Sequence, residues 1–261
     1  MNTLAHPQTR PAGTLYLVPT PLDFGCHHQT PLTECLPQKT IDISAQLSHW
    51  VCENAKSHRA FLKRVHELSP LQTPLQSQSL VELPREAHKK GDHQGSFNGK
   101  DLLQFALEGH DMGLVCEAGM PAIADPGSSV VRAAHAMGIQ VRTLVGPSSL
   151  MLALAGSGMN GQNFSFVGYL PQAPEARQER LRYLDQWARK SLQTQIFIET
   201  PYRNKSMLDS LLQTLSAQTR LAVACGLGLP DEHIESHLVQ VWRERSIKPD
   251  LKAPCIFLLG T

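Results

Sequence analysis

The stretch Cys116-Glu-Ala-Gly-Met-Pro-Ala-Ile-Ala-Asp-Pro-Gly-Ser-Ser129 decides the fold of this chain. It follows an apolar run, Met112 to Val115, which predicts a buried β-strand. Prolines and glycines then predict a turn, and Asp125 before Pro126 predicts a helix start, with Asp125 as the N-cap and Pro126 as the first helical residue. Open α/β sheets form ligand crevices where strand, turn and helix follow in this order, and Gly119 would let backbone approach a ligand closely.

The rest of the chain repeats this alternation of apolar runs and helical patterns, which is typical of parallel α/β units. Up to residue 145, strands are predicted near 14–19, 48–53, 112–117 and 140–145, with helices near 55–67, 99–109 and 127–137. Beyond it, strands are predicted near 163–168, 194–199, 220–225, 235–242 and 253–259, with helices near 148–157, 174–190 and 202–216. We therefore expect a disordered tail over 1–12 and two α/β domains, 13–145 and 146–261, with a ligand cleft between them.

The segment 69–98 is polar and contains three prolines, and only 79–83 within it has the pattern of a strand. Long segments without regular structure are usually functional or disordered. Because it lies just before the loop 116–129, we favour a substrate-facing role for it over a passive loop.

Composition sets limits on function. The chain has 261 residues, 41% of them hydrophobic, which is enough for two modest cores. A net charge of +1 gives no global basic field for nucleic acid. No apolar run approaches the roughly 20 residues of a membrane-spanning helix, and the N-terminus has no basic-then-apolar signal. We expect a cytoplasmic protein that does not cross a membrane.

The cysteines and histidines show no ligand spacing. None of the six cysteines forms a Cys-x-x-Cys pair, and Cys52, Cys116 and Cys255 lie in apolar surroundings, so we expect buried free thiols. His27-His28 and the pair His88 with His93 lack a convincing metal-ligand set. We therefore expect no metal site.

Segment 117–127 resembles the Asp-Ala-Gly-Thr-Pro-x-x-x-Asp-Pro-Gly signature of the tetrapyrrole (corrin/porphyrin) methylase superfamily, in its 16S ribosomal-RNA cytidine 2′-O-methyltransferase branch. Glu117 stands where the branch has Asp, and Met120 where it has Thr. Four more segments resemble the family in its order: Thr14-Leu-Tyr-Leu-Val-Pro-Thr-Pro21, Val145-Gly-Pro-Ser-Ser149, Phe166-Val-Gly-Tyr-Leu-Pro171 and Phe197-Ile-Glu-Thr-Pro-Tyr-Arg203.

The resemblance implies the two-domain fold of these methylases, S-adenosylmethionine as cofactor, a homodimer, and small-subunit ribosomal RNA as a candidate substrate. It implies a cofactor site made by Pro19, Pro21, Glu117, Ala118, Gly119, Pro121, Ile123, Ser148, Gly226, Leu227 and Pro254. It implies a substrate end with Glu53, Arg59 and Arg203 as the candidate catalytic residues.

The substrate end departs from the branch. Where the branch has Glu-Asp-Thr-Arg, this chain has Glu53-Asn54-Ala55-Lys56, and Asn cannot act as a base, while Lys lacks the planar fork of Arg. Segment 225–233 lacks an Arg and a Lys that the branch carries there. We therefore expect an S-adenosylmethionine-dependent methyltransferase with an altered substrate end, and weak RNA binding with a shallow salt dependence. The alternatives are a methylase of a small metabolite or another RNA, and a cofactor-binding protein without catalysis.

Three of these residues and segments have structural alternatives. Glu53 could be an acid that interacts with a helix dipole. Glu199 could form a structural ion pair with an Arg, for which we favour structure over function, whereas for Arg203 we favour function. Helix 174–190 carries Arg177, Arg180, Arg182, Arg189 and Lys190 beside Glu175, Glu179 and Asp185, and we interpret it as a solvated mixed-charge face.

Overall fold

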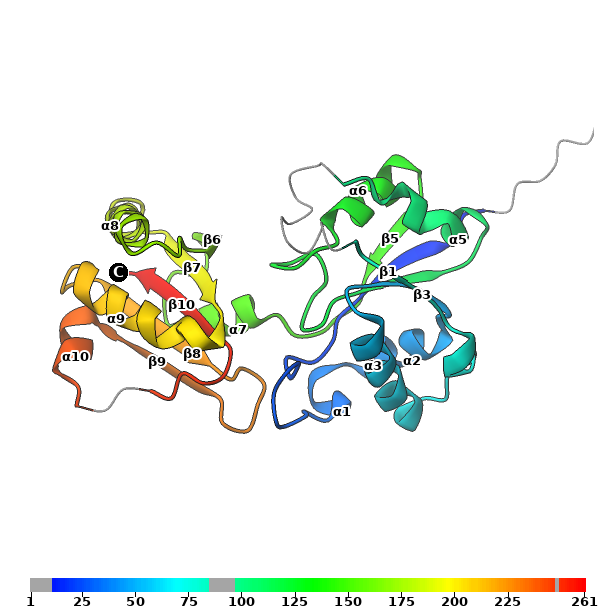
Figure 1. Cartoon of the computed structure of the whole chain (residues 1–261), viewed down its shortest axis with the longest axis horizontal. Helices are drawn as coiled ribbons and strands as arrows, with labels where there is room; N and C mark the ends of the chain where they lie inside the picture. The colour runs from blue at the N-terminus through cyan, green and yellow to red at the C-terminus, as the bar shows by residue number, and fades with distance from the viewer. Residues whose placement is uncertain (1–10, 85–96, 247–248) are drawn as a thin grey trace, which may run out of the picture. The chain divides into compact units, whose positions relative to one another are not determined.

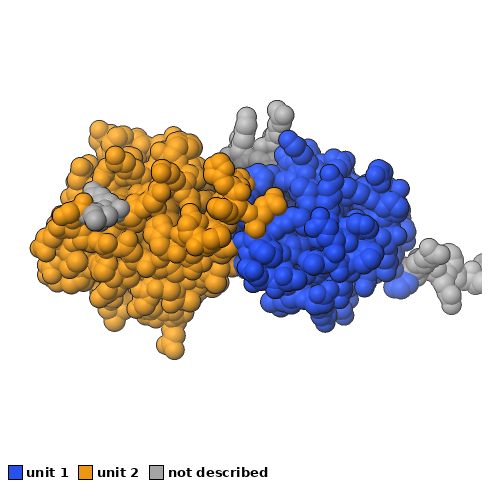
Figure 2. Space-filling view, turned by 90° about the horizontal axis from the view of Figure 1, so that it is seen from below, with its two compact units in different colours: residues 1–24, 30–147 blue, residues 25–29, 148–261 orange. Residues whose placement is uncertain are grey.

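The computed structural model describes residues 11–84, 97–246 and 249–261. Contacts divide the chain into two compact units, residues 1–24 with 30–147 and residues 25–29 with 148–261, which Figure 2 draws in blue and orange. Most of the expected tail and the stretch 85–96, with His88 and His93, lie outside the described residues.

Unit 1 is built on a five-stranded parallel sheet with the order β3-β2-β4-β1-β5. Its strands are β1 (Thr14–Val18), β2 (His49–Cys52), β3 (Ser79–Glu82), β4 (Met112–Val115) and β5 (Gln140–Thr143). Its helices are α1 (Leu32–Cys35), α2 (Gln38–Gln46), α3 (Ala55–Leu68), η1 (Leu75–Ser77), η2 (Gly99–Leu103), α5 (Gln104–Leu107) and α6 (Ser128–Ala136). β4 is buried along its whole length, as a central parallel strand should be.

Each face of this sheet carries its own apolar core. Figure 1 shows α2 and α3 on one side of the strands and α5 and α6 on the other. On one face, α1, α2 and α3 pack around Trp50, whose indole nitrogen donates to Gln78 Oε1 at 2.8 Å. On the other face, η2, α5 and α6 pack around Met112 and Leu114. A Cβ on Gly113 would come within 2.2 Å of the Trp50 ring, so Gly113 makes room for the largest side chain of the first core.

The connections that leave β1 and β4 run to opposite faces of the sheet. From β1 the chain passes through α1 and α2 to β2 on one side, and from β4 it passes through α6 to β5 on the other. β1 and β4 are neighbours, so a topological switch point lies at their carboxyl ends. In open α/β sheets, this is where ligand crevices form.

Unit 2 has a mixed five-stranded sheet with the order β6-β7-β10-β8-β9, in which only β6 and β7 are parallel. Its strands are β6 (Phe164–Tyr169), β7 (Thr194–Glu199), β8 (Arg220–Cys225), β9 (His233–Leu238) and β10 (Cys255–Gly260). Its helices are α7 (Ser149–Ser157), α8 (Pro174–Ser191), η3 (Pro201–Arg203), α9 (Asn204–Thr214) and α10 (Val239–Glu244).

One face of the second sheet is covered by α8, α9 and α10, which enclose the stacked rings of Phe197 and Phe257 together with Trp242. α7 packs against β8, β9 and β10, where a Cβ on Gly156 would come within 2.3 Å of Ile234. None of the described helices is both long and apolar enough to span a membrane.

Two sequence predictions of secondary structure are wrong. The strand expected at 235–242 ends at Leu238, and the chain continues as α10, whose Val239 and Trp242 turn into the core at helical spacing. The helices α1 and α2 were not predicted; Pro31 and Pro37 occupy their N-cap positions.

Candidate active site

The loops that follow β1 and β4 are joined at the switch point by an antiparallel bridge. Thr20 N donates to Gly119 O and Gly119 N to Thr20 O, each at 3.0 Å. The Thr20 hydroxyl lies 3.3 Å from Cys116 O. Gly119 has φ 77°, and a Cβ there would lie 3.1 Å from Leu22 and 3.4 Å from Pro147 O. The loop 116–127 therefore has a fixed position, and glycine is required at its tip.

A carboxylate fixes this loop from the neighbouring strand. Glu53, directly after β2, accepts the backbone N–H of Glu117 at 2.8 Å through Oε2. The Ser57 hydroxyl, in the first turn of α3, lies 3.2 Å from Glu117 Oε1. Because β2 and β4 are parallel neighbours, their carboxyl ends bring both acids to one edge of the sheet. Glu53 is thus a positioning residue for the loop.

Asp125 completes an acidic cluster with Glu53 and Glu117. Burial and the negative charge of Glu53, with a smaller contribution from Glu117, raise the pKa of Asp125 to about 7. Burial also raises the pKa of the Cys116 thiol well above its usual value. Asp125 is therefore balanced between its neutral and charged forms near neutral pH, as groups in functional sites often are.

The backbone around Asp125 differs from the expectation. The expected N-cap role is wrong: α6 begins at Ser128, and Gly127 is its N-cap with φ 130°, so Pro126 is not the first helical residue. Ala122 and Ala124 both adopt φ 64°, a left-handed conformation that is uncommon for residues with a side chain. The Asp-Pro-Gly segment thus continues the strained loop, and such strain gathers at functional sites.

Asn54 caps helix α3. Its side chain accepts the N–H groups of Lys56 at 2.9 Å and Ser57 at 3.2 Å, and Ala55 N donates to Glu82 Oε1 at 2.7 Å. Asn and Asp are equally good N-caps. Asn54 therefore has a structural role in this chain, one that an Asp could fill equally well.

The remaining unit 1 residues of the expected cofactor site belong to the same two loops. Pro19, Pro21 and Pro121 are buried, Ala118 is partly buried, and Ile123 is exposed. The loop after β1 is further fixed through Asp23, which accepts from Thr30 N at 2.9 Å and pairs with Arg64 at 3.1 Å. Arg59 is exposed on α3.

The expected cofactor residues of unit 2 flank a disulfide bond. Cys225, at the end of β8, is bonded to Cys255, the first residue of β10. The prediction of a free thiol at Cys255 is wrong, because antiparallel pairing places the two cysteines opposite each other although 30 residues separate them. Beside the bond, Gly226 N donates to Pro254 O at 3.1 Å. Leu227 is buried.

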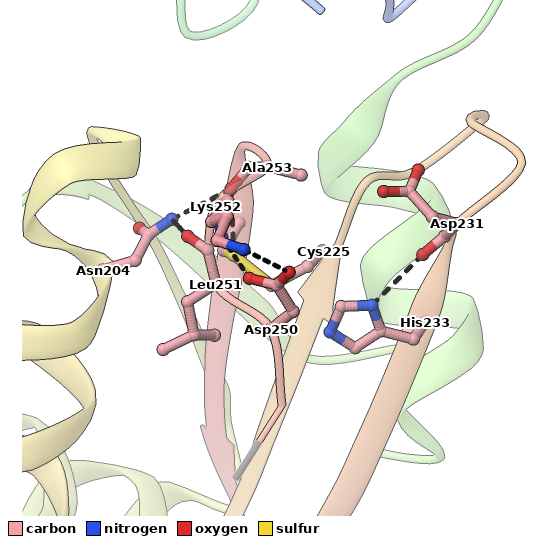
Figure 3. The surroundings of a disulfide bond; sticks show 9 residues. Asn204, Cys225, Asp231, His233, Asp250, Leu251, Lys252 and Ala253 are labelled. Atoms are coloured by element: carbon pink, nitrogen blue, oxygen red, sulfur yellow. Dashed lines mark hydrogen bonds and ion pairs between the residues drawn. A yellow bond between two sulfur atoms is a disulfide. The ribbon is translucent and has the colours of Figure 1, made fainter. Parts of the chain in front are cut away.

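Asn204 holds the loop that leads into β10 (Figure 3). Its side-chain nitrogen donates to Leu251 O and Ala253 O, each at 3.0 Å, and Asn204 is fully buried at the start of α9. The sequence analysis missed this residue, because a lone Asn inside a helical pattern gives no such signal. Ser148, the other expected unit 2 residue, is the N-cap of α7.

Glu199, the last residue of β7, forms an ion pair with Arg203. Glu199 Oε1 lies 2.7 Å from Arg203 Nη2 and 2.9 Å from Nε. Glu199 therefore forms the structural ion pair that was the favoured interpretation, and the same contact fixes the position of the Arg203 side chain. The expected solvated face of α8 is partly wrong, because Arg177 and Asp185 are buried, and Asp185 accepts from Ser216 N at 3.0 Å.

The structure thus brings Pro19, Pro21, Glu53, Glu117, Ala118, Gly119 and Pro121 together in unit 1, and Gly226, Leu227 and Pro254 together in unit 2. Thr20 and Ser57 were missed as contributors, although their neighbours in sequence were named. Within the described ranges, the structure contains no group of three or more His, Cys, Asp or Glu side chains that could hold a metal ion.

Comparison with known proteins gives consistent matches. The family model of the Tetrapyrrole (Corrin/Porphyrin) Methylases matches residues 52–240. A "Ribosomal RNA small subunit methyltransferase I" from Micromonospora olivasterospora is 33% identical over 85% of this chain and 61% of its own length. A protein of the same name from Xylella fastidiosa is 42% identical over 47% of this chain. Another from Streptococcus pyogenes serotype M6 is 29% identical over 95% of this chain.

The alignments span 61% and 43% of the lengths of the Micromonospora and Xylella relatives. Among solved structures, the methyltransferase CobJ matches with a TM-score of 0.58 and 16% identity, over 96% of this chain and 95% of its own. A uroporphyrin-III C-methyltransferase from Thermus thermophilus, solved with S-adenosyl homocysteine, matches with a TM-score of 0.52 and 17% identity, over 95% and 97%. At these identities the likeness confirms the predicted fold class.

Proposed function

Because the chain belongs to the tetrapyrrole (corrin/porphyrin) methylase family, we propose that it is an S-adenosylmethionine-dependent methyltransferase whose substrate is RNA of the small ribosomal subunit. One observation carries the proposal. The segment that resembles the family signature, 117–127, forms a glycine-tipped loop at the switch point of a parallel sheet. Ligands bind at such points.

The acidic cluster fits this cofactor. S-adenosylmethionine supplies a methyl group on a positively charged sulfonium, and it also carries an ammonium. Glu53, Glu117 and Asp125 repel one another, which is one reason why Asp125 holds its proton up to about pH 7. A bound cation would reduce that repulsion and favour the charged form of Asp125. The cluster therefore complements a cationic ligand.

In unit 2, the family resemblance also names Gly226, Leu227 and Pro254 as cofactor contacts, and we propose them as such. Gly226, Leu227 and Pro254 lie on two loops joined by the disulfide and by a backbone hydrogen bond. A loop of this kind offers backbone groups and apolar surface rather than charge, which suits an adenine ring. We assign the adenine to these loops on the ground of the family resemblance.

Catalysis in this proposal rests on alignment. Methyl transfer is an in-line displacement, and a protein accelerates it chiefly by holding nucleophile, carbon and leaving sulfur in register. Glu53 contributes by fixing the loop 116–119 through Glu117 N. Arg203, held by Glu199 through Nε and Nη2, keeps its remaining N–H donors for a substrate phosphate. Arg59 is the corresponding exposed cation of unit 1.

The RNA substrate, a homodimeric assembly and cytoplasmic residence come from the relatives' names and from the family resemblance, and are proposed on that ground. A second candidate is a methylase of another substrate or a silent cofactor-binding protein. The observation that favours it is that position 54 carries Asn rather than Asp, engaged as a helix cap. It offers no base to a ribose hydroxyl.

Calorimetry tests the cofactor assignment. We expect S-adenosylmethionine to bind and to release part of a proton near pH 7, because Asp125 ionises when the cation arrives. Titrations in two buffers of different ionisation heat measure that proton. Asp125→Asn should bind without proton release. Absence of binding by the wild-type chain would overturn the proposal.

Complementation tests the substrate. The chain is expressed in a bacterium that lacks its own small-subunit methyltransferase I, and the ribosomal RNA is mapped for restored methylation. Restoration supports the RNA assignment and shows that Asn54 and Lys56 are tolerated. Cofactor binding without label transfer to ribosomal subunits, in purified components, would instead favour the second candidate.

A further inference from the structure

The exposed side of α3 carries a row of basic side chains. Lys56, Arg59, Lys63 and His66 are spaced by three, four and three residues, so they lie one above the other on a single helix face. All four are exposed. At 1.5 Å per residue the row extends over roughly 15 Å. We call these four residues the basic row.

The orientation of the row is fixed by the inner face of the same helix. His58, Phe61, Leu62 and Val65 are buried in the core between α3 and the sheet. α3 therefore cannot rotate without exposing that core. Helix α3 carries a second arginine, Arg64, which is partly buried. Arg64 is not part of the row, because it pairs with Asp23.

The charges of the row are available. Among the described residues, Lys56, Arg59 and Lys63 form no ion pair. The acids nearest to the row are Glu67, beside His66, and Glu82, whose carboxylate accepts Ala55 N. Glu53 and Glu117 lie at the Lys56 end, where Glu53 accepts Glu117 N and Glu117 contacts Ser57. Cations left exposed in a row on a rigid helix are suited to a polyanion.

A hollow of about 520 Å³ lies at the far end of the row. Lys63, His66 and Glu67 line it from α3, and Leu71, Pro74, Leu75 and Gln76 line it from the segment before β3. Its volume falls within the range of small-ligand sites. It combines an apolar wall with a polar rim in which Lys63 supplies a positive charge and Glu67 a negative one. The apolar wall suits a flat base, and Lys63 suits the phosphate attached to it.

The near end of the row lies at the candidate active site. Helix α3 begins directly after its N-cap Asn54, and Lys56 is the second residue of the helix. The neighbouring Ser57 bonds to Glu117 of the acidic cluster. The row therefore leads from that cluster along α3, which is labelled in Figure 1, to the hollow.

We propose that the basic row and the hollow bind a single-stranded segment of the RNA substrate next to the nucleotide that is methylated. Lys56, Arg59 and Lys63 each contact a phosphate, and an unstacked base lies in the hollow against Leu71, Pro74 and Leu75. Single-stranded RNA is recognised by cations along its backbone and by surfaces that receive unstacked bases, most often aromatic rings, and His66 supplies such a ring at the hollow. This inference rests on the proposed function and specifies where its substrate binds.

Binding of a short single-stranded RNA without cofactor tests the row. The triple variant Lys56→Gln, Arg59→Gln, Lys63→Gln loses three phosphate contacts, so the slope of log affinity against log salt should become shallower by about 2. The ratio of wild-type to variant affinity for the RNA should accordingly fall about 18-fold when the salt concentration rises from roughly 50 to 200 mM. The matched control is Arg182→Gln, Lys190→Gln, Lys205→Gln, with the same charge change at exposed positions of unit 2, and it should keep the wild-type slope.

An abasic RNA of the same length tests the hollow. This RNA lacks the one base that would enter the hollow. We expect the wild-type chain to bind it at least about fivefold more weakly than intact RNA, because the contact of that base with the hollow is lost. Equal binding of both RNAs, or equal slopes for the triple variant and its control, would overturn the inference. So would tighter binding of the row to anionic phospholipid vesicles than to RNA.

The outcomes separate this inference from the proposed function. If label transfer to ribosomal RNA occurs but the triple variant binds RNA as the wild type does, the function stands and the row is not the binding surface. If the row binds RNA as expected but no methyl label reaches it, the inference stands and the proposed reaction fails.

Discussion

The loop 116–127 of unit 1 and the paired loops around Gly226 and Pro254 of unit 2 are positioned by different kinds of force. The first is held by the Thr20 bridge and by Glu53, beside carboxylates that repel one another. The second is held by a disulfide and by an uncharged amide, Asn204. The geometry of the first loop should therefore respond to pH and ligand, and that of the second to reduction.

The largest expected effect is on the glycine of the first loop. Gly119→Val places a branched side chain where φ is 77° and Leu22 lies 3.1 Å from the new Cβ, so the loop must move. We expect cofactor affinity to fall by about 100-fold or more, the factor that about 3 kcal/mol corresponds to. Calorimetry measures it.

Gly138→Val is the matched control for Gly119→Val. Gly138 has φ 71° but nothing within 4 Å of a Cβ, so it carries the same backbone strain away from the loop. It should reduce stability while cofactor affinity stays unchanged. A folded Gly119→Val variant with wild-type affinity would remove the loop from the cofactor site.

The next effect concerns the covalent link of the second loop pair. The double variant Cys225→Ser, Cys255→Ser should lower the free energy of unfolding by about 2–4 kcal/mol, because the unfolded chain regains the freedom of a closed loop. Denaturant titration measures it, with Cys35→Ser as the control for losing a thiol. If adding a thiol reductant leaves wild-type stability unchanged while the double variant is destabilised, the loss is due to packing rather than to the bond.

The strand and the ligand loop of unit 1 could be predicted from the sequence, because both depend on residues that are close together in the chain. The apolar run 112–115, the glycine at 119 and the prolines predicted a strand and a ligand loop, because strand and turn propensities act over a few residues. The fold class and the family followed from the same segments. The helix start at Pro126 was wrong, because Ala122 and Ala124 extend the left-handed loop to Gly127.

What the sequence did not show depends on contacts between distant segments. The pairing of Cys225 with Cys255 follows from the antiparallel register of β8 and β10. The link from Glu53 to Glu117 N follows from the pairing of β2 with β4, across 64 positions. Neither register is written in local propensity, because it is fixed by packing of the whole sheet.

A smaller effect is the response of unit 1 to pH. The folded-state pKa of Asp125, about 7, lies above its unfolded value, so the folded state binds the extra proton between about pH 4 and 7 and stability falls as pH rises through that range. Asp125→Asn removes this loss. We expect the variant to equal the wild type near pH 4 and to exceed it at pH 8. A shift of about three pKa units corresponds to about 4 kcal/mol, and solvent screening of the partly exposed Asp125 reduces the expected difference to about 2 kcal/mol.

The difference between variant and wild type is the quantity to measure, because His58 acts in the opposite sense. Burial lowers the pKa of His58 to about 3, so its contribution is lost as pH falls below the unfolded value of about 6.5. His58 is present in both proteins and cancels. A stability difference that does not change with pH would show that Asp125 ionises normally.

The smallest expected effect tests the cluster itself. Glu53→Gln keeps an oxygen to accept Glu117 N but removes a negative charge that raises the pKa of Asp125, so that pKa should fall towards the ordinary aspartate value. Carbon-detected NMR titration of the Asp125 carboxyl measures the change, at most about one unit, since burial is the larger cause. Glu82→Gln is the control, because Glu82 bonds to Ala55 N and is not among the charges that act on Asp125. An equal fall in both variants would show a general field rather than a cluster. An unchanged pKa in Glu53→Gln would leave burial, with the smaller effect of Glu117, as the cause, and the cationic ligand would then gain nothing from Glu53.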